Sequence, residues 1–433
     1  MSDKPKNCVG QRMHELAARL YPMHRAITGR GVRQTFAELA KHIPLQITEV
    51  PTGTPVLDWH VPQEWTLHDA YIADAGTGQR LIDVADSTLH IVNHSRSVNA
   101  EMSWDELQPH LSTVPEFEDR LPYRTGFFQK TWGFCLSEKQ KNSIADPNRL
   151  YKVVIDSDTV DGSLCYAECV LPGKSERTVI LYAHCCHPSL ANDNLSGLVV
   201  ATQLAQELQT RHLKHTYRIV FAPATIGAIT WLAQNERMMS QIDYGLVLTL
   251  LGDRGNLTYK RSRRATSAID RIAENVVSDA GGSIRNFTPD GYDERQFCSP
   301  GFDLPVGCLM RTPPGEFNEY HTSADNLDFI QPQYLRQSLS ALLRIVDQIE
   351  DNVIPVSLRP KGEPRLGQHG LYKAFGEKGN DSELQAALMW VLNQADGSTD
   401  IDTIANRSGL QLQLLRDAIR ILSEHELVAL STD

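Results

Sequence analysis

Strand-like and helix-like segments alternate through the middle of this 433-residue chain, and this alternation limits the folds that it can adopt. Residues 177–184, RTVILYAH, contain a continuous apolar run, which is typical of a strand buried on both faces. An amphipathic segment follows at 194–210, then a strand-like run at 216–223, a helix-like run at 227–236 and a strand-like run at 244–253. Strand, helix and strand in succession predict an α/β fold with a doubly wound, mostly parallel sheet.

The order of the segments divides the chain into three predicted domains. Residues 1–58 and 151–352 form the α/β core. Residues 59–150 consist of short β-like runs separated by Gly and Asp turns, which predicts a small inserted β-rich domain. Prolines among charged residues mark a linker at 353–366. Residues 367–433 follow as three helical patterns and a short strand, an order typical of a winged-helix-like module.

Charge and cysteine content indicate the setting in which the protein works. There are 53 acidic and 42 basic side chains, a net charge of -11, so we expect neither nucleic acid nor an anionic membrane as a partner. The first residues lack the apolar segment of an export signal. Among the 8 cysteines, Cys185 and Cys186 are adjacent, a poor geometry for a structural disulfide. We therefore expect a cytoplasmic protein with reduced thiols, assembled as a homo-oligomer.

The densest cluster of reactive side chains follows the strand at 177–184. Ligands of open α/β sheets bind beyond the carboxyl ends of strands, and the sequence AHCCHPSLANDNLSG places two histidines and an aspartate there. An imidazole from His187 and the carboxylate of Asp193 can reach one Zn²⁺ from a tight loop. His184, at the strand end itself, stays open as the alternative first histidine. Thiolates of Cys185 and Cys186 are a weaker alternative, as metal ligands or as a nucleophile, than two small buried side chains.

A second cluster, GEFNEYHTSADNLDFI, follows the strand-like run at 305–311. It supplies His321 as a third ligand, with Asp325 and Asp328 as partners that can orient its imidazole. Two histidines, one carboxylate and a free position for water are the usual ligand set of hydrolytic zinc, so we expect one zinc ion per chain. Tyr320 can steady a developing oxyanion, although a structural role is equally open.

Three charged residues precede the segment FCSPGF. Asp293, Glu294 and Arg295 can hold the free amine or carboxylate of a substrate through charge-assisted hydrogen bonds. A solvated charged loop is the equal alternative.

These motifs resemble those of the zinc aminopeptidase-like amidohydrolases. The strings CHPSLANDNLSG and YHTSADNLDFI look like that family's metal-binding segments. The strings YPMHRAITGRGVR, WGFCLS and DERQFCSPGF have counterparts in a bacterial group known as polysaccharide biosynthesis proteins with an aminopeptidase-like domain. The resemblance covers nearly the whole chain. It implies an aminopeptidase core with a small inserted domain and a C-terminal winged helix, and a group that includes enzymes removing leucine from bipyridine antibiotic intermediates. Asp193 matches the metal-bridging aspartate and His321 the last histidine, and the CHPS string favours His187 as the first.

One position departs from the family pattern. The family carries paired glutamates after the next strand, the first as general base and the second as metal ligand. This chain has Ala224 and Thr225 in FAPATIGAI, where the bacterial group has P-E-T-I-G. The missing second glutamate favours one zinc rather than two, with Asp253 as the only nearby candidate for a further ligand. Ala224 cannot take a proton, so the chain is either a naturally inactive enzyme or a Glu→Ala variant, and the otherwise intact site favours the variant.

Two functions follow from these expectations. The first is metal-dependent removal of an N-terminal amino acid, for example leucine, from a small peptide or an aminoacylated biosynthetic intermediate. The second is a catalytically inactive pseudo-peptidase that binds a ligand and acts in regulation. DNA binding by the C-terminal module is disfavoured. Its last helix offers Arg416 and Arg420, but Asp417, Glu424 and Glu426 offset them, so an assembly or packing role is favoured.

Overall fold

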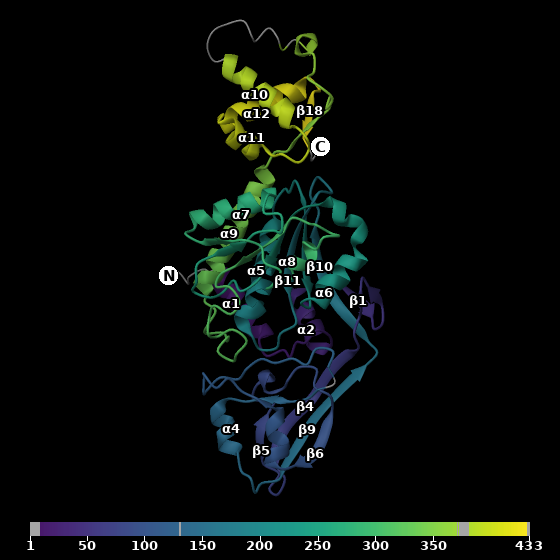
Figure 1. Cartoon of the computed structure of the whole chain (residues 1–433), viewed down its shortest axis with the longest axis vertical. Helices are drawn as coiled ribbons and strands as arrows, with labels where there is room; N and C mark the ends of the chain where they lie inside the picture. Colours follow the sequence, from purple (N-terminus) through teal and green to yellow (C-terminus); the bar gives the residue numbers. More distant parts are fainter. Residues whose placement is uncertain (1–8, 130, 370, 372–380, 431–433) are drawn as a thin grey trace, which may run out of the picture. The chain divides into compact units, whose positions relative to one another are not determined.

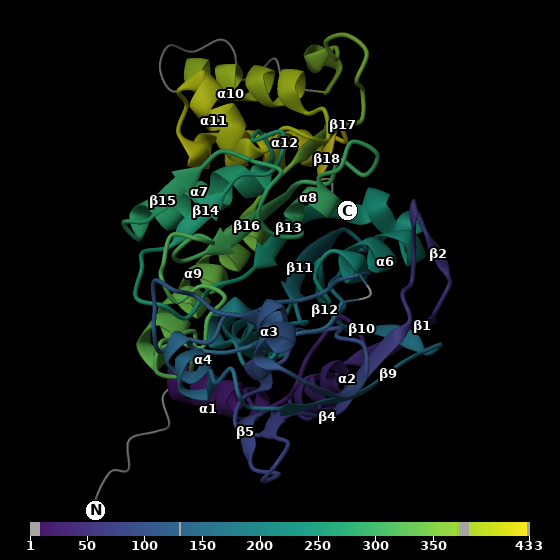
Figure 2. The same ribbon diagram turned by 60° about the horizontal axis from the view of Figure 1, so that its bottom comes forward.

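The computed structural model describes residues 9–129, 131–369, 371 and 381–430. Its internal contacts divide the chain into two compact units, residues 1–345 and 346–433. The larger unit is built around an eight-stranded sheet (Figures 1 and 2). Figure 2 shows the strands across this sheet in their order. The order is β1 (Gln46–Pro51), β10 (Ser163–Leu171), β12 (Thr216–Ala222), β11 (Thr178–His184), β13 (Ile242–Leu248), β16 (Val306–Met310), β14 (Thr258–Lys260) and β15 (Ser283–Arg285).

The centre of this sheet is parallel. Strands β12, β11, β13 and β16 run side by side in one direction. On one side β10 is antiparallel to both β12 and β1, and on the other β14 is antiparallel to β16 and parallel to β15. All seven residues of β11 are buried, as the continuous apolar run requires of a central strand. The predicted α/β class with a doubly wound, mostly parallel sheet is confirmed.

Helices cover the sheet because each of its faces is apolar. Ile180 and Tyr182 of β11 pack into a cluster with residues of α6 (Ile226–Gln234) and α8 (Glu294–Phe297). Side chains alternate between the faces of a strand, so the residues between them lie on the face of α5 (Gly197–Leu208). The other helices of this unit are α1 (Val9–Leu20), α2 (Arg30–Leu39), α7 (Ala268–Asp279) and α9 (Pro332–Asp351), which continues into the second unit.

A second, antiparallel sheet lies within the larger unit and has its own apolar core (Figure 1). Its order is β5 (Arg80–Asp83), β4 (Glu64–Asp74), β9 (Tyr151–Val160) and β6 (Val98–Met102). The boundary predicted at 150/151 assigned β9 to the α/β core, but β9 pairs with β4 and β6. The burial of its residues gives the reason. Buried and exposed positions alternate along β9, which suits an antiparallel sheet with one wet face rather than a central parallel strand.

Short elements connect the two sheets. The hairpin of β2 (Pro55–Val56) and β3 (Trp59–His60) precedes β4. The segment between β6 and β9 holds α3 (Trp104–Leu107), β7 (Leu111–Ser112), β8 (Phe134–Cys135) and α4 (Glu138–Ile144). The seven cysteines in the described part of the chain are free and buried.

The second unit contains α10 (Asp381–Gln394), α11 (Ile401–Ser408), α12 (Leu412–Glu424) and a two-stranded sheet of β17 (Pro355–Ser357) and β18 (Val428–Leu430). The side chain of Asp400 accepts a hydrogen bond from the Thr403 N–H and caps α11, and Gly409 ends it with a φ of 72°. The linker predicted at 353–366 is partly wrong, because β17 lies within this range and pairs with β18. Within the described ranges, no helix is both long and apolar enough to span a bilayer.

Candidate metal centre

The site forms where β11 ends at the carboxyl edge of the sheet. His184 is the last residue of β11, and the chain then turns through a short helical segment, Ala191–Ser196, into α5. The turn lies tightly against β13, since the Asn194 side chain donates to the Leu248 carbonyl at 3.0 Å. A Cβ on Gly197 would lie 2.5 Å from that same carbonyl oxygen, so only glycine fits at the start of α5.

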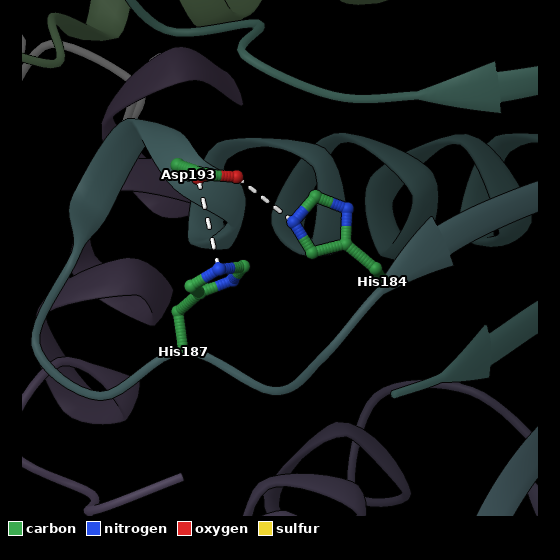
Figure 3. A group of neighbouring side chains, drawn as sticks. All are labelled: His184, His187 and Asp193. Carbon is green, nitrogen blue, oxygen red and sulfur yellow. Dashed lines mark hydrogen bonds and ion pairs between the residues drawn. The ribbon is translucent and has the colours of Figure 1, made fainter. Parts of the chain in front are cut away.

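Asp193 is the centre of the cluster, and its carboxylate is completely buried. Oδ1 accepts from His184 Nε2 at 2.8 Å and from the Tyr292 hydroxyl at 3.2 Å. Oδ2 lies 3.0 Å from His321 Nε2 and 3.9 Å from His187 Nε2. Figure 3 shows His184 and His187 converging on Asp193 from the strand end and from the following loop. Three imidazoles thus surround a single carboxylate.

Both histidines that the sequence left as alternatives take part in this cluster. His184, His187 and Asp193 each offer one ligand atom, and these atoms lie within 4.8 Å of one another. His184 and His321 contact opposite oxygens of Asp193, whereas His187 lies on the Oδ2 side with His321. The predicted set of His187, Asp193 and His321 is therefore brought together, and His184 joins it.

His321 reaches the cluster from the loop after β16. Its ring stacks on Tyr320, with centroids 4.0 Å apart, and its carbonyl accepts the Tyr123 N–H at 2.7 Å. Tyr123 comes from the segment between β6 and β9, and its ring meets both His187 and His321 edge-on, at 4.9 and 5.2 Å. Two segments distant in sequence thus fix the position of this imidazole.

Burial sets the charge of these groups. Desolvation lowers the pKa of His187 to about 3, so its imidazole is neutral at neutral pH. The pKa of Asp193 is held well below its ordinary value by the three histidines, despite the opposing effect of burial. Neutral imidazoles and a carboxylate are the protonation states that zinc requires of its ligands. Burial raises the pKa of the Cys185 thiol to about 12 and also raises the pKa of Cys186 well above its ordinary value, which argues against both as thiolate ligands or nucleophiles.

Two aspartates do not take the roles predicted for them at His321. The carboxylate of Asp325 accepts the backbone N–H groups of Asn192, at 2.5 Å, and Asp193, at 3.0 Å, instead of an imidazole N–H. Burial raises the pKa of Asp325 to about 8. Asp328 is exposed, and its N–H donates to the Asn326 side chain at 2.9 Å. Asp325 therefore supports the turn that carries Asp193.

Asp253, the predicted candidate for a further ligand, is bound elsewhere. Its Oδ2 accepts from the Asn192 amide at 3.0 Å, and its Oδ1 accepts from the Thr312 hydroxyl at 2.6 Å and the Gly255 N–H at 2.7 Å. With both oxygens turned to these donors, Asp253 braces the 192–193 turn and lies outside the ligand cluster.

Ala224 lies beside the histidine loop, two residues after the end of β12. Its N–H donates to Cys186 Sγ at 3.3 Å, and that sulfur is 3.7 Å from His187 Nδ1. The next residue, Thr225, has a φ of 61° and donates its N–H to Asp293 at 2.8 Å. The structure thus holds the 224–225 turn against the histidine loop, where a longer side chain at position 224 would be close to the cluster.

The charged residues predicted to hold substrate have partners inside the protein. Asp293 is buried beneath the 224–225 turn, and burial raises its pKa. Glu294 is also buried and forms an ion pair with Lys260 at 2.7 Å. Arg295 donates to the Pro289 carbonyl at 3.2 Å. The carboxylates of Asp293 and Glu294 lie in the interior because the start of α8 packs onto the core. The prediction that they face the amine of a substrate is therefore wrong.

Three residues around the site were not singled out from the sequence. Arg25 is buried and donates to the carbonyls of His187, at 2.8 Å, and Pro188, at 2.9 Å. Tyr292 stacks on His184 and hydrogen-bonds Tyr320. The string YPMHRAITGRGVR was a usable signal for Arg25, whereas nothing local marks Tyr292 or Tyr123.

Comparisons with known proteins agree with this picture. Residues 14–352 match a family described as a domain of unknown function, DUF4910, and residues 353–430 match a winged helix-turn-helix family. A protein of Clostridium acetobutylicum is 42% identical over 423 residues, covering 97% of this chain and 96% of its own, and is named as a polysaccharide biosynthesis protein with an aminopeptidase-like domain.

Solved structures extend the comparison. A crystal structure from Clostridium acetobutylicum, assigned as a peptidase, is 40% identical, covers 98% of both chains and has a TM-score of 0.81. A zinc aminopeptidase from Bacillus subtilis is 10% identical, covers 78% of this chain and 94% of its own, and has a TM-score of 0.56, a likeness of fold alone. The larger unit therefore has the zinc-aminopeptidase fold, and the chain belongs to the DUF4910 family, with a winged helix at its C-terminus.

Proposed function

We propose that this protein is a metal-dependent, peptidase-type amidohydrolase that removes an N-terminal amino acid, with leucine as a candidate, from a short peptide or an aminoacylated biosynthetic intermediate. The observation that carries the proposal is the convergence of His184, His187 and His321 on the buried carboxylate of Asp193. The aminopeptidase-like domain in the name of the Clostridium acetobutylicum relative and the zinc aminopeptidase fold support the same class.

The residues of the cluster fit zinc, and we propose one ion per chain. His187 and His321 both lie next to Oδ2 of Asp193, and these three residues would hold the zinc ion. His184 contacts the other oxygen, Oδ1, and would fix the orientation of the carboxylate. Bound zinc lowers the pKa of water toward neutrality and polarises a carbonyl. This is the chemistry that amide hydrolysis needs.

The chain's own residues have separate tasks in this proposal. Arg25 and Tyr123 hold the histidine loop and His321 in position from two sides. Tyr320 stacks on His321 and is proposed to steady the oxyanion that develops on the substrate carbonyl. A carboxylate at position 224 would accept a proton from the attacking water and pass it to the leaving amine, which the methyl group of Ala224 cannot do.

Restoration of that carboxylate tests the proposal. Ala224→Glu is expected to raise kcat on leucine amide by about 10²–10⁴-fold, because a positioned general base contributes that much. Zinc content is measured alongside by elemental analysis, with His321→Ala as a variant expected to lose the metal and Arg336→Gln, an exposed change on α9, as the control. A zinc-loaded Ala224→Glu protein that hydrolyses no aminoacyl amide would contradict the proposal.

Ala224 itself favours a second function. A pseudo-peptidase would bind an amide at the same cluster without cleaving it and act in regulation. The two functions separate in one comparison. If the protein is a hydrolase whose general base is missing, Ala224→Glu should make it hydrolyse the leucine amide that it binds. If it is a pseudo-peptidase, the unaltered chain and the variant should bind leucine amide equally well, and neither should hydrolyse it.

The proposed setting follows from charge and composition. The net charge of -11 favours a small-molecule or short-peptide amide as the partner over nucleic acid or an anionic membrane. We also propose a cytoplasmic location and a homo-oligomer. Size-exclusion chromatography with light scattering measures the second of these directly.

A further inference from the structure

A cavity of about 470 Å³ lies between the N-terminal segment and the inserted sheet of the larger unit. Its volume falls in the range of small-molecule sites. This cavity is separate from the metal cluster, because none of the candidate metal ligands lines it. The lining residues that matter here are Ile27, Trp65, His94, Arg96, Gly126 and Phe128.

One wall of the cavity is part of a continuous row of aromatic rings. Successive ring centroids in this row lie 5.1 to 5.9 Å apart. The row runs through His24, Trp65, His94, Phe127, Phe128 and Trp59. It begins in the interior and ends at the surface, where Phe128 is 60% and Trp59 41% exposed. An exposed aromatic ring that lines a cavity, as Phe128 does, favours a planar apolar ligand that stacks on it.

Two chain segments connect this cavity to the metal cluster. Ile27 lines the cavity, and two residues earlier Arg25 donates to the His187 carbonyl. Gly126 also lines it, and three residues earlier Tyr123 packs against His187 and His321. Three residues of extended chain span at most about 10 Å, so each connection is short. The cavity and the cluster are therefore near neighbours in the larger unit.

The charge of the lining is supplied by one side chain. Burial lowers the pKa of His94 to about 4, which leaves its imidazole neutral at neutral pH. Arg96 is exposed, and its guanidinium forms no ion pair with the part of the chain that the structure describes. An unpaired guanidinium at the edge of an aromatic wall attracts a carboxylate, to which it can bond through two N–H groups.

We propose that this cavity is a specificity site for the distal part of the amide substrate, a planar aromatic group that carries a carboxylate. The aromatic row stacks on the ring and Arg96 binds the carboxylate. Binding of an aromatic carboxylate stands on the cavity alone, whereas its place in a substrate rests on the proposed hydrolase function.

Binding of 2-naphthoate, measured by calorimetry, tests the cavity. The full chain is used both stripped of metal and loaded with zinc, so that any carboxylate binding at the cluster is recognised. One site per chain with the same Kd in both forms is expected. Arg96→Gln and Phe128→Ala should each weaken binding by about tenfold or more, the loss expected for one charged hydrogen bond or one stacked ring. Both side chains are exposed, so these variants retain the fold.

Matched surface changes serve as controls. Arg336→Gln and Leu150→Ala alter an exposed arginine and an exposed leucine away from the cavity and should leave the Kd unchanged. Neutral 2-naphthamide should bind to the unaltered chain more weakly than 2-naphthoate does. The Arg96→Gln variant should bind the two compounds with equal affinity. Binding that requires zinc, or that both cavity variants leave unchanged, overturns the proposal, as does an absence of binding.

Hydrolysis tests the link to the metal cluster in the Ala224→Glu protein. The leucine amide of 6-amino-2-naphthoate should show a KM raised about tenfold by Arg96→Gln with little change in kcat, whereas the KM for leucine amide stays the same. If naphthoate binds as expected and neither amide is cleaved, the hydrolase proposal and the substrate link fall and the binding site stands. If leucine amide is cleaved and naphthoate does not bind, the hydrolase stands and the cavity proposal falls.

Discussion

Asp193 remains charged although it is completely buried, and the groups around it explain why. Its two oxygens receive four polar contacts, from three imidazoles and the Tyr292 hydroxyl. A buried carboxylate without such partners would be neutral, since desolvation disfavours the charged form. The backbone N–H of the same residue is held by Asp325, so both ends of Asp193 are fixed.

Replacement of Asp325 tests how much this support matters. Asp325→Asn puts an amide NH₂ against one of the two backbone N–H donors and loses that hydrogen bond, so the 192–193 turn shifts. Zinc affinity should fall about 10–100-fold, as it does when groups that orient metal ligands are removed. Competition with a chelator measures the affinity. Asp328→Asn, an exposed carboxylate in the same loop, is the control, and an equal loss there would show that the loop's charge rather than the turn is responsible.

His94 should make the stability of the fold depend on pH. Burial lowers its pKa to about 4 in the folded protein, against about 6.5 in the unfolded chain. Between these values the unfolded chain binds a proton that the folded protein does not, so the free energy of unfolding falls as the pH falls, by about 1.4 kcal/mol per pH unit and roughly 3 kcal/mol in all. Other buried histidines contribute as well.

The variant His94→Asn isolates this contribution, because asparagine tolerates the positive φ of 68° at this position. Urea unfolding is measured at steps between pH 7 and 4. The difference between the two proteins should be constant near pH 7 and shift progressively in favour of the variant at lower pH. Parallel pH profiles would show that His94 titrates normally in the folded state.

At the scale of elements, the site depends on how closely the α5 turn approaches the end of β13. The contact is made by the Asn194 side chain, which bridges the Leu248 carbonyl and the Gly197 N–H. Such a bridge leaves no space for a side chain at the first position of α5. The geometry of the metal ligands is therefore coupled to the packing of a helix on a strand.

The variant Gly197→Ala should disturb both the metal ligands and the packing of α5 on β13. Its Cβ would lie 2.4 Å from Asn194 Oδ1 and 2.5 Å from the Leu248 oxygen, and relief of such overpacking costs about 1–3 kcal/mol. We expect a lower free energy of unfolding together with weaker zinc binding. Gly301→Ala is the matched control, because nothing lies within 4 Å of its added Cβ. A destabilised variant with unchanged zinc affinity would show that the turn and the helix move independently.

The elements that could be predicted are those whose signal is local. The apolar run of β11 and the helix after it follow from periodicity, and so does the strand end at His184, which the loop with His187 follows. The partner of a strand carries no such signal. β9 begins with the apolar pattern VVI yet joins the inserted sheet, and the proline-containing β17 reads as linker although it pairs with β18.

The same distinction applies to the site. Asp193 and His321 lie in motifs with recognisable spacing, and the structure brings them within 3.0 Å. Asp253 and Asp325 have the right residue type, but their hydrogen bonds to Asn192 and its neighbours depend on three-dimensional packing. Tyr123 approaches from an inserted segment some 200 positions away from His321, and no pattern in either segment announces that contact.

At the scale of the whole molecule, the C-terminal unit has the elements of a winged helix without the charge that DNA binding uses. On α12, Arg416 and Arg420 are exposed, and Arg420 forms an ion pair with Glu424 at 3.0 Å. A strand of phosphates is bound by several uncompensated basic side chains. The chain as a whole carries a net charge of -11, which repels a polyanion further.

We therefore expect the full chain to bind duplex DNA only weakly, with a Kd of about 10⁻⁴ M or weaker at physiological salt, which is the weakest affinity typical of non-specific DNA binding. Fluorescence anisotropy with a labelled random duplex measures this. The triple change Asp417→Lys, Glu424→Lys and Glu426→Lys should tighten binding and introduce a steep dependence on salt, because it removes the acidic groups that offset the two arginines. Micromolar binding by the unaltered chain, lost in Arg416→Gln and Arg420→Gln, would instead identify α12 as a recognition helix and overturn the assembly role argued for this unit.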